Sequence, residues 1–257
     1  MNGVFYIGAT GLEAQQRALD VLAHNITNMN TSTFKRSSVQ FVELIAPTPG
    51  AEDPAHSFSD PISGLSGVRA ASSNIVWTQG DMKATGSSSD IAINGNGFIE
   101  VQGTDGQLKL WRGGTLKVNS DGFLATSDGL ALRSMISVPT NATNLAIATD
   151  GTVTAVTAAG EQATKLGQIE LANVANPELL QPIGGGYFDN PQGDTVTSVI
   201  AGQEGSGTLV QGSLEGANVD LADQMVNLLL VQRAYGASAQ LVQAGDQVMS
   251  ILNNLRK

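Results

Sequence analysis

This chain is poor in histidine and cysteine, two residue types that often catalyse reactions. It contains two histidines, His24 and His56, and no cysteine, which excludes disulfides, thiol nucleophiles and cysteine-bound zinc. His56 lies in a segment rich in proline and glycine. A Ser-His-Asp arrangement using His56 stays open, although no nucleophile-elbow motif supports it. A solvated or interface histidine is the better interpretation of both.

Carboxylates and glycines also fail to form a convincing site. Asp90, Glu100 and Asp105 could include a glycosidase pair, but only 5% of the residues are aromatic and able to stack on a sugar. The Gly-Asn-Gly sequence at 95–97 lacks the third glycine of a dinucleotide loop, and a strand-like run follows it. The Asp-Gly pairs lack the alternating acidic spacing of a calcium loop. We therefore predict no catalytic residue, no cofactor and no metal site.

Charge and length limit the possible partners. The chain has 257 residues and a net charge of −10, enough for one large domain or two small ones. An acidic protein does not suit nucleic acid or an anionic membrane surface. No apolar run approaches the roughly 20 residues of a membrane span. Residues 1–10 carry no basic residue or leader-like core, so we expect export, if it occurs, without a cleaved signal peptide.

The N-terminal stretch has the periodicity of an amphipathic helix. Apolar residues recur every seven positions, with a second set filling the complementary seam. Asparagine and threonine at 28–31 favour turns, so the helix should end there. The seam consists of Leu12, Gln15, Leu19, Leu22, Ile26 and Met29.

The C-terminal stretch predicts a second and longer helix. Asn218 or Asp220 can cap it, and Asp223 suits its first turn. One stripe alternates spacings of three and four and a second stripe lies beside it, so the apolar face is broad enough to meet several neighbours. The first stripe is Met225, Leu228, Gln232, Tyr235, Ala239, Val242, Asp246 and Met249; the second is Val231, Ala234, Ser238, Leu241, Val248, Leu252 and Leu255.

The middle of the chain predicts β structure. Short alternating runs are separated by Asp-Gly or Asn-Gly pairs, which favour tight hairpin turns. A segment at 47–67, rich in proline, glycine and serine, predicts a long loop or an ordered arm. The predicted strands are at 91–93, 98–101, 108–111, 136–138, 145–147 and 168–171, and the turns at 94–95, 105–106, 121–122, 128–129 and 150–151.

These patterns together predict an α+β protein. The N- and C-terminal helices form a coiled-coil unit, and between them lie an extended Pro/Gly/Ser-rich arm and a glycine-rich all-β domain. The helices either close a domain as an antiparallel pair or form an assembly interface. The expected division is 1–34 for the N-terminal helix, 35–76 for the linker and arm between subunits, 77–213 for the β domain and 214–257 for the C-terminal helix.

Several long motifs resemble the bacterial flagellar rod and hook protein family. They occur in the same order as in that family and run from one end of the chain to the other. Departures from the family pattern are His24 for asparagine, Thr33 for glycine, Gly113 for aspartate and Gly236 for a larger helix former. The motifs are TGLEAQQ at 10–16, AHNITNMNTSTFKR at 23–36, QGDM at 79–82, DIAINGNGF at 90–98, QGSLEGANVD at 211–220 and QRAY at 232–235.

The resemblance implies an axial structural protein of the flagellar basal body, without enzymatic activity. Such proteins pass through the flagellar type III export apparatus without a cleaved leader, stack helically into a hollow rod across the periplasm, and transmit motor torque to the hook. Their terminal helices form an inner coiled-coil layer with the β domain outside. The length and the stretch at 67–81 are most similar to members that build the distal rod.

The implied partners are further copies of the chain in a helical homopolymer, proximal rod proteins, the hook protein or its junction, the surrounding outer-membrane and peptidoglycan ring proteins, and the export apparatus. The alternatives are a proximal rod or hook subunit, a secreted β-rich adhesin and a carbohydrate-active enzyme; a typical hook subunit is considerably longer. We expect the 47–67 arm to lie between subunits and stiffen the shaft. The expected assembly residues are Leu12, Leu19, Leu22, Ile26, Met225, Leu228, Tyr235, Leu241, Val242, Met249 and Leu252.

Overall fold

The chain divides into two units. A computed structural model describes residues 2–45, 65–103, 106–142, 144–156, 163–191, 193 and 195–255. The described parts of 1–27, 37–76 and 220–257 form one unit, called here the helical unit, and those of 28–36 and 77–219 form the other, the β unit. The described chain therefore passes between the units at four points: 27/28, 36/37, 76/77 and 219/220.

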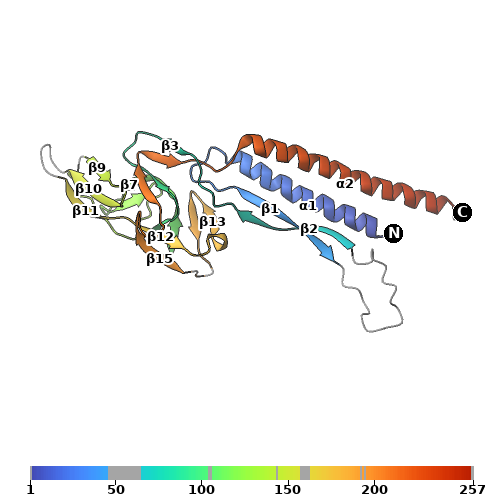
Figure 1. The fold of residues 1–257 in the computed structure, drawn as a ribbon, viewed down its shortest axis with the longest axis horizontal. Coiled ribbons are helices and arrows are strands. Elements are labelled where there is room, and N and C mark those ends of the chain that lie inside the picture. Colours follow the sequence, from blue (N-terminus) through green and yellow to red (C-terminus); the bar gives the residue numbers. More distant parts are fainter. Residues whose placement is uncertain are drawn as a thin grey trace, which may run out of the picture. The chain divides into compact units, whose positions relative to one another are not determined.

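Among the described residues, two helices and a pair of antiparallel strands make up the helical unit. Helix α1 (Asn2–Thr27) contacts both α2 (Leu221–Leu255) and the antiparallel pair of β1 (Ser37–Ile45) and β2 (Leu65–Ile75). Figure 1 shows α1 alongside α2. The helices run antiparallel, because Gly8 lies beside Val242 while Gly11 lies beside Ser238. The buried face of α1 consists mainly of small residues: Gly8, Gly11, Ala14, Ala18, Leu22 and Asn25.

Both helix ends form where the sequence predicts. α1 ends at Thr27, and the backbone then turns, with Thr31 N donating to Asn28 O at 3.0 Å. At the start of α2, Asp220 Oδ1 accepts hydrogen bonds from the backbone N–H of Ala222 (2.8 Å) and of Asp223 (3.3 Å). Of the two candidate caps, Asp220 is therefore the one used.

Strands β1 and β2 occupy part of the segment predicted as linker and arm. Ser37 pairs with Ile75 and Ile45 with Leu65, and the register shifts between Gln40 and Phe41. These strands were not among those predicted, because their serine, glutamine and glutamate residues give no clear alternation. Both strands contact α1, and this tertiary contact supports them although the sequence pattern does not predict them. Residues 46–64, most of the predicted arm, lie outside the described residues.

Short antiparallel strands build the β unit. The described strands group as β16–β4–β7–β8, β13–β14–β6–β5, β11–β10–β9, β12–β15 and β17–β3. A 3₁₀ turn, η1 (Pro177–Leu179), follows β12. The strand bounds are β3 Met82–Ala84, β4 Asp90–Asn94, β5 Ile99–Gln102, β6 Leu108–Trp111, β7 Gly113–Val118, β8 Leu124–Thr126, β9 Asn144–Ile147, β10 Thr152–Val156, β11 Thr164–Gln168, β12 Glu170–Val174, β13 Gln181–Gly184, β14 Tyr187–Asp189, β15 Val196–Ile200, β16 Thr208–Gln211 and β17 Ser213–Glu215.

The core of the β unit draws on residues far apart in sequence. Strand β4 pairs with β7 on one edge and β16 on the other, so Ile91 lies opposite Gln211. Aliphatic side chains from many strands fill the interior, with a second, aromatic cluster around Phe98 and Phe188. Completely buried members of the main cluster include Ile91, Ile93, Val101, Val153 and Leu171.

Most predicted strands and turns are present, with three corrections. Residues 136–138 form no strand: Met135 has a φ of +42°, and Ser137 makes only an isolated bridge to Phe123. The run at 168–171 is split, because β11 ends at Gln168 and β12 begins at Glu170. The turn at 94–95 is no hairpin, because β4 and β5 belong to different sheets. Turns at 121–122 and 150–151 do connect paired strands, with positive φ at Gly122 and Gly151.

Candidate functional site: the assembly surface of the terminal helices

Small residues bring α1 and α2 close together. A Cβ atom placed on Gly8 would lie 2.5 Å from Val242 Cγ2, well inside van der Waals contact, and one on Gly11 would lie 3.3 Å from Ser238 Oγ. Gly245 similarly packs against the ring of Phe5. The two helices are therefore too close together at Gly8 to accommodate a larger residue there.

A polar side chain fixes the register of the helical unit near the end of α1. Asn25 is 1% exposed. Its Nδ2 donates to Ser37 O at 2.8 Å and to Gln224 Oε1 at 3.3 Å, and its Oδ1 accepts from Ser37 N at 2.9 Å. Because a buried amide must satisfy these groups, it ties α1, α2 and β1 in one alignment.

The expected assembly residues fall into two groups. Six are buried or half-buried within their own chain, and four are 40% to 54% exposed. The side chain of Leu252 lies outside the described side chains. Leu22 is buried; the half-buried residues are Leu12, Leu19, Ile26, Leu228 and Val242, and the exposed ones are Met225, Tyr235, Leu241 and Met249.

A second apolar stripe of α2 is largely exposed. We call it the outer stripe; its large side chains are 52% to 78% exposed and lie at spacings that are sums of three and four. Between them, Arg233, Ala237 and Ala244 continue the same row. From 226 to 255 the row is about 44 Å long at 1.5 Å per residue. The outer stripe consists of Val226, Leu230, Leu241, Val248, Ile251 and Leu255.

Sequence reasoning identified only part of this stripe. It placed Leu241, Val248 and Leu255 in its second row but missed Val226, Leu230 and Ile251, which follow the same three-and-four spacing. Periodicity alone could not tell which row faces α1. The packing of Val242 against Gly8 decides it. An apolar row of this length, rarely left uncovered on a monomer, is the strongest candidate for a contact surface.

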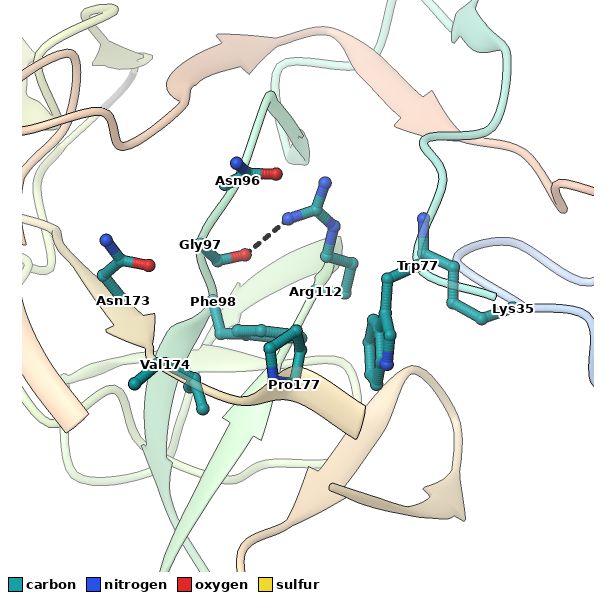
Figure 2. A pocket seen from close by; sticks show the side chains of 10 residues that line it. Lys35, Trp77, Asn96, Gly97, Phe98, Arg112, Asn173, Val174 and Pro177 are labelled. Carbon is teal, nitrogen blue, oxygen red and sulfur yellow. Dashed lines mark hydrogen bonds between the residues drawn. The ribbon is translucent and has the colours of Figure 1, made fainter. Parts of the chain in front are cut away.

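The β unit contains a small cavity, which has no catalytic constellation. It measures about 240 Å³ and is lined by Lys35, Trp77, residues 96–98, Arg112, residues 173–175 and Pro177 (Figure 2). Its two cations both pair with Glu215, at 2.5 Å for Lys35 Nζ and 2.9 Å for Arg112 Nε. The cavity therefore offers aromatic and amide surface, and its charges are already used in structural contacts.

The other chemically competent residues are also in structural roles or outside the described part. Asp90 accepts from the hydroxyls of Thr85 (2.6 Å) and Thr115 (2.7 Å), while Glu100 pairs with Arg133. Asp105 and His56 lie outside the described residues, and His24 is on the exposed side of α1. Within the described ranges, no group of three His, Cys, Asp or Glu residues could hold a metal ion, and no helix could span a membrane.

Comparison with known proteins gives the family. Three family models match: "Flagella basal body rod protein" at residues 5–35, "Flagellar hook protein FlgE/F/G D1 domain" at 92–155 and "Flagellar basal body rod FlgEFG protein C-terminal" at 210–255. The flagellar basal-body rod protein FlgG of Buchnera aphidicola subsp. Acyrthosiphon pisum is 34% identical over 255 residues, covering 97% of this chain and 98% of that protein. FlgG of Borreliella burgdorferi is 32% identical and covers both chains completely. The chain belongs to the FlgG family of flagellar basal-body rod proteins.

Membership of the FlgG family makes the chain a structural subunit of the flagellar distal rod rather than an enzyme. A hook–basal body complex protein of Bacillus subtilis, FlhP, is more distant, at 26% identity over 265 residues. Because the FlgG relatives match over the whole chain, the proximal rod, hook and adhesin alternatives are not favoured.

One departure from the family pattern has a visible structural consequence. Thr33 stands where the resemblance leads us to expect glycine, and its φ is +62°, a region that β-branched residues rarely adopt. Its backbone N–H donates to Glu215 O at 2.8 Å. Thr33 therefore adopts a left-handed backbone, which glycine takes without steric cost, and bonds β17 in that conformation.

Proposed function

We propose that copies of this chain polymerise head-to-tail, through the terminal helices, into the hollow helical shaft of the distal rod, which transmits motor torque to the hook. The observation that carries the proposal is the exposed outer stripe of α2. Two different surfaces in contact generate an open helix rather than a closed ring. Because α1 covers a different face of α2, the stripe is available to a second copy of the chain.

The interface residues follow from exposure. The outer stripe, together with Met225, Tyr235 and Met249, contacts neighbouring copies, and Leu252 is assigned to the same surface from its position in the sequence. Six further residues support this surface by packing the helices of one chain together: Leu12, Leu19, Leu22, Ile26, Leu228 and Val242. The three-and-four spacing suits knobs-into-holes packing between copies, as in a coiled coil. In this proposal the helices α1 and α2 build the inner layer of the rod, and the β unit builds the outer domain.

Assembly would also supply stability that the single chain lacks. A helix with one covered face and one long exposed apolar row gains free energy each time that row is buried. The chain can therefore pass unfolded through the type III export apparatus and fold as it joins the rod. Its neighbours there would be proximal rod proteins, the hook or its junction, and the surrounding ring proteins. The net charge of −10 suits an outer face that turns without sticking.

A charge placed on the outer stripe tests the proposal. Leu241→Asp should leave the purified monomer folded, because Leu241 is 54% exposed, yet prevent distal rod growth and swimming. Burying one leucine contributes about 1.5–3 kcal/mol, and the loss recurs at every subunit. Gln243→Asp, an equal charge on another exposed position of α2, is the matched control and should assemble.

Electron microscopy of basal bodies reads out both variants and a deletion strain. The deletion strain and Leu241→Asp should each show a rod that stops at its proximal part. Complete rods and hooks with Leu241→Asp would remove the outer stripe from the interface. A deletion strain whose rod is complete and lacks only the hook would instead identify a hook subunit.

A further inference from the structure

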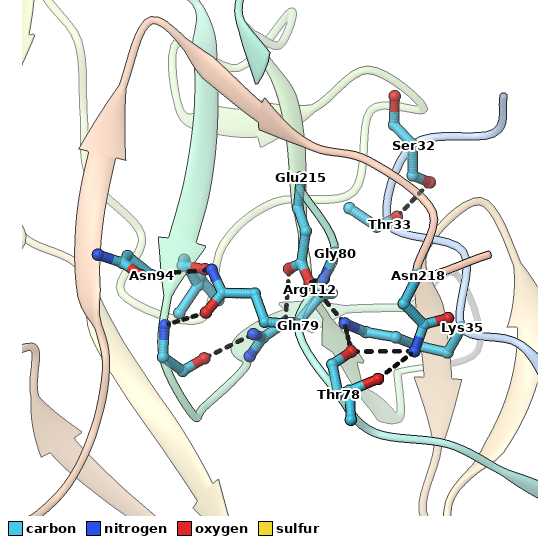
Figure 3. Close-up of polar contacts among 12 residues, drawn as sticks. Ser32, Thr33, Lys35, Thr78, Gln79, Gly80, Asn94, Arg112, Glu215 and Asn218 are labelled. Atoms are coloured by element: carbon cyan, nitrogen blue, oxygen red, sulfur yellow. Dashed lines mark hydrogen bonds and ion pairs between the residues drawn. The ribbon is translucent and has the colours of Figure 1, made fainter. Parts of the chain in front are cut away.

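The carboxylate of Glu215 is completely buried at the end of β17 and is bound from three directions (Figure 3). Its Oε1 accepts from Lys35 Nζ at 2.5 Å and from the backbone N–H of Gly80 at 3.0 Å, and its Oε2 accepts from Arg112 Nε at 2.9 Å. The three donors come from sequence positions more than 100 residues away from Glu215. One side chain therefore holds three separate parts of the chain.

Further hydrogen bonds join the same segments around this carboxylate. Lys35 Nζ also donates to Thr78 O at 2.9 Å. Asn218 Oδ1 accepts from Arg36 N at 2.7 Å, and Asn218 Nδ2 donates to Thr78 O at 3.0 Å. Arg112 anchors the group to the sheets, since its Nη1 and Nη2 donate to the carbonyls of Gly97 and Gly95, each at 2.5 Å.

These segments are the ones that adjoin the passages of the chain between the two units. Residues 28–36 lie between the passages at 27/28 and 36/37, residue 77 follows the third, and residue 219 precedes the fourth. Lys35, Thr78 and Asn218 lie within three residues of a passage. All four passages therefore adjoin segments tied to Glu215 on the side of the β unit.

Burial makes these contacts obligatory. The side chains of Lys35, Arg112 and Glu215 are 2%, 6% and 0% exposed. Desolvation lowers the pKa of Lys35 from its ordinary value, and the neighbouring Glu215 opposes that shift. Breaking such a pair leaves a buried charge without a counterion, which is far more costly than losing an exposed pair. Directional ion pairs also fix geometry in a way that apolar contacts do not.

We propose that Lys35, Arg112 and Glu215 form a clamp that holds the segments adjoining the four passages, 28–36, 77–80 and 213–219, together in the β unit. Mechanical load arriving through the chain from the helices then enters a fixed base rather than four independent linkers. This role in carrying load rests on the proposed function as a rod subunit. The clamp itself is a property of the single chain. Glu215 acts as a positioning residue.

Hydrogen exchange of the full-length monomer tests the clamp without any need for assembly. In Glu215→Gln, amide exchange at 28–36, 77–80 and 213–219 should become at least about tenfold faster, while β4 and β7 stay protected. The matched control is Glu100→Gln, which makes the same substitution in the pair with the exposed Arg133 and should leave those three segments unchanged.

A milder variant covers the case in which Glu215→Gln fails to fold. Asn218→Ala removes the bonds to Arg36 and Thr78 and leaves every buried charge paired, so faster exchange confined to 34–36 and 77–79 is expected. Unchanged exchange in both variants, or equal acceleration over the whole β unit in Asn218→Ala, would overturn the clamp. Leu241→Asp should have normal exchange there, which separates failure of the clamp from failure of the assembly surface.

Motility tests the mechanical part. Cells carrying Asn218→Ala should build rods but swim more slowly than Glu100→Gln cells in viscous medium, where the load on the rod is higher. Equal speeds, combined with the faster exchange, would contradict the role in carrying load and leave the clamp as a structural feature only.

Discussion

At the scale of single residues, buried polar groups carry most of the specificity of this protein. Asn25 aligns the helical unit, and Glu215 gathers the connecting segments of the β unit. Both are surrounded by donors and acceptors supplied by distant parts of the chain. A wrong register would leave these groups buried without partners, so they select one arrangement from many that would bury similar apolar surface.

Tyr187 gives the β unit a predictable dependence on alkaline pH. Its hydroxyl bonds Asp128 Oδ2 at 2.7 Å and Thr126 Oγ1 at 2.8 Å, and desolvation is the main cause that raises its pKa to about 12. Free tyrosine titrates near pH 10. Since the unfolded state loses the proton first, the stabilisation is complete below about pH 10 and disappears as the pH rises towards 12.

Urea unfolding at a series of pH values measures this effect. Wild type should exceed Tyr187→Phe by about 1 kcal/mol at neutral pH, the value of a hydrogen bond, and lose that advantage between about pH 10 and 12. Tyr6→Phe, on an exposed position of α1, should follow wild type throughout. A constant difference between wild type and Tyr187→Phe up to pH 12 would show that the hydroxyl does not titrate as stated.

At the scale of elements, the role of each residue in a helix depends on whether its face of the helix is covered. α2 places one row against α1 and leaves the outer stripe exposed, although both rows have the same spacing. The same principle applies to Gly8 of α1 and Gly236 of α2. Gly8 faces Val242 closely, whereas a Cβ on Gly236 would meet no atom within 4 Å.

Two alanine substitutions should therefore have opposite effects. Gly236→Ala should stabilise the chain by about 1 kcal/mol, because alanine favours the helix and meets open space. Gly8→Ala gains the same propensity but forces a methyl group against Val242, so we expect a net loss of about 1–2 kcal/mol. Thermal unfolding followed by circular dichroism measures both. Stabilisation by Gly8→Ala would mean that the two helices are not packed as described.

At the scale of the whole molecule, the sequence predicts that the segment between β1 and β2 takes part in assembly. Residues 46–64 lie outside the described residues. We predict from the sequence that the arm lies between subunits and stiffens the shaft. Removing residues 48–63 keeps Ile45 and Leu65, which pair in the hairpin, and should yield rods that bend more easily.

Electron microscopy of isolated rods checks this prediction through their curvature. The deletion should widen the distribution of bending angles, because fewer contacts join neighbouring subunits. A second variant replaces the same residues with a Gly/Ser linker of equal length. It keeps the length of the chain but removes the side chains, so its rods should also bend more easily. Rods from either variant that are as straight as wild type would remove the arm from any stiffening role.

Much of the architecture could be predicted because it depends on local pattern. The two helices, the end of α1 near residue 28, a cap of α2 at either Asn218 or Asp220 and most of the short strands follow from periodicity and turn chemistry. The family likewise follows from contiguous motifs at both ends. Tertiary packing overrode the local pattern at 136–138, where burial of Ile136 and Val138 did not require a strand.

The sequence by itself determined that this protein has apolar helical ends, a turn-rich acidic middle and the motifs of a rod protein. Only the tertiary structure decided which row of α2 faces α1, that β16 closes the sheet beside β4, and that Lys35, Arg112 and Glu215 meet. The physical reason is the distance along the sequence over which each interaction acts. Periodicity and capping act within a few residues of chain, whereas the partners of a buried charge come from segments up to 180 residues apart, and no local pattern encodes which of them will meet.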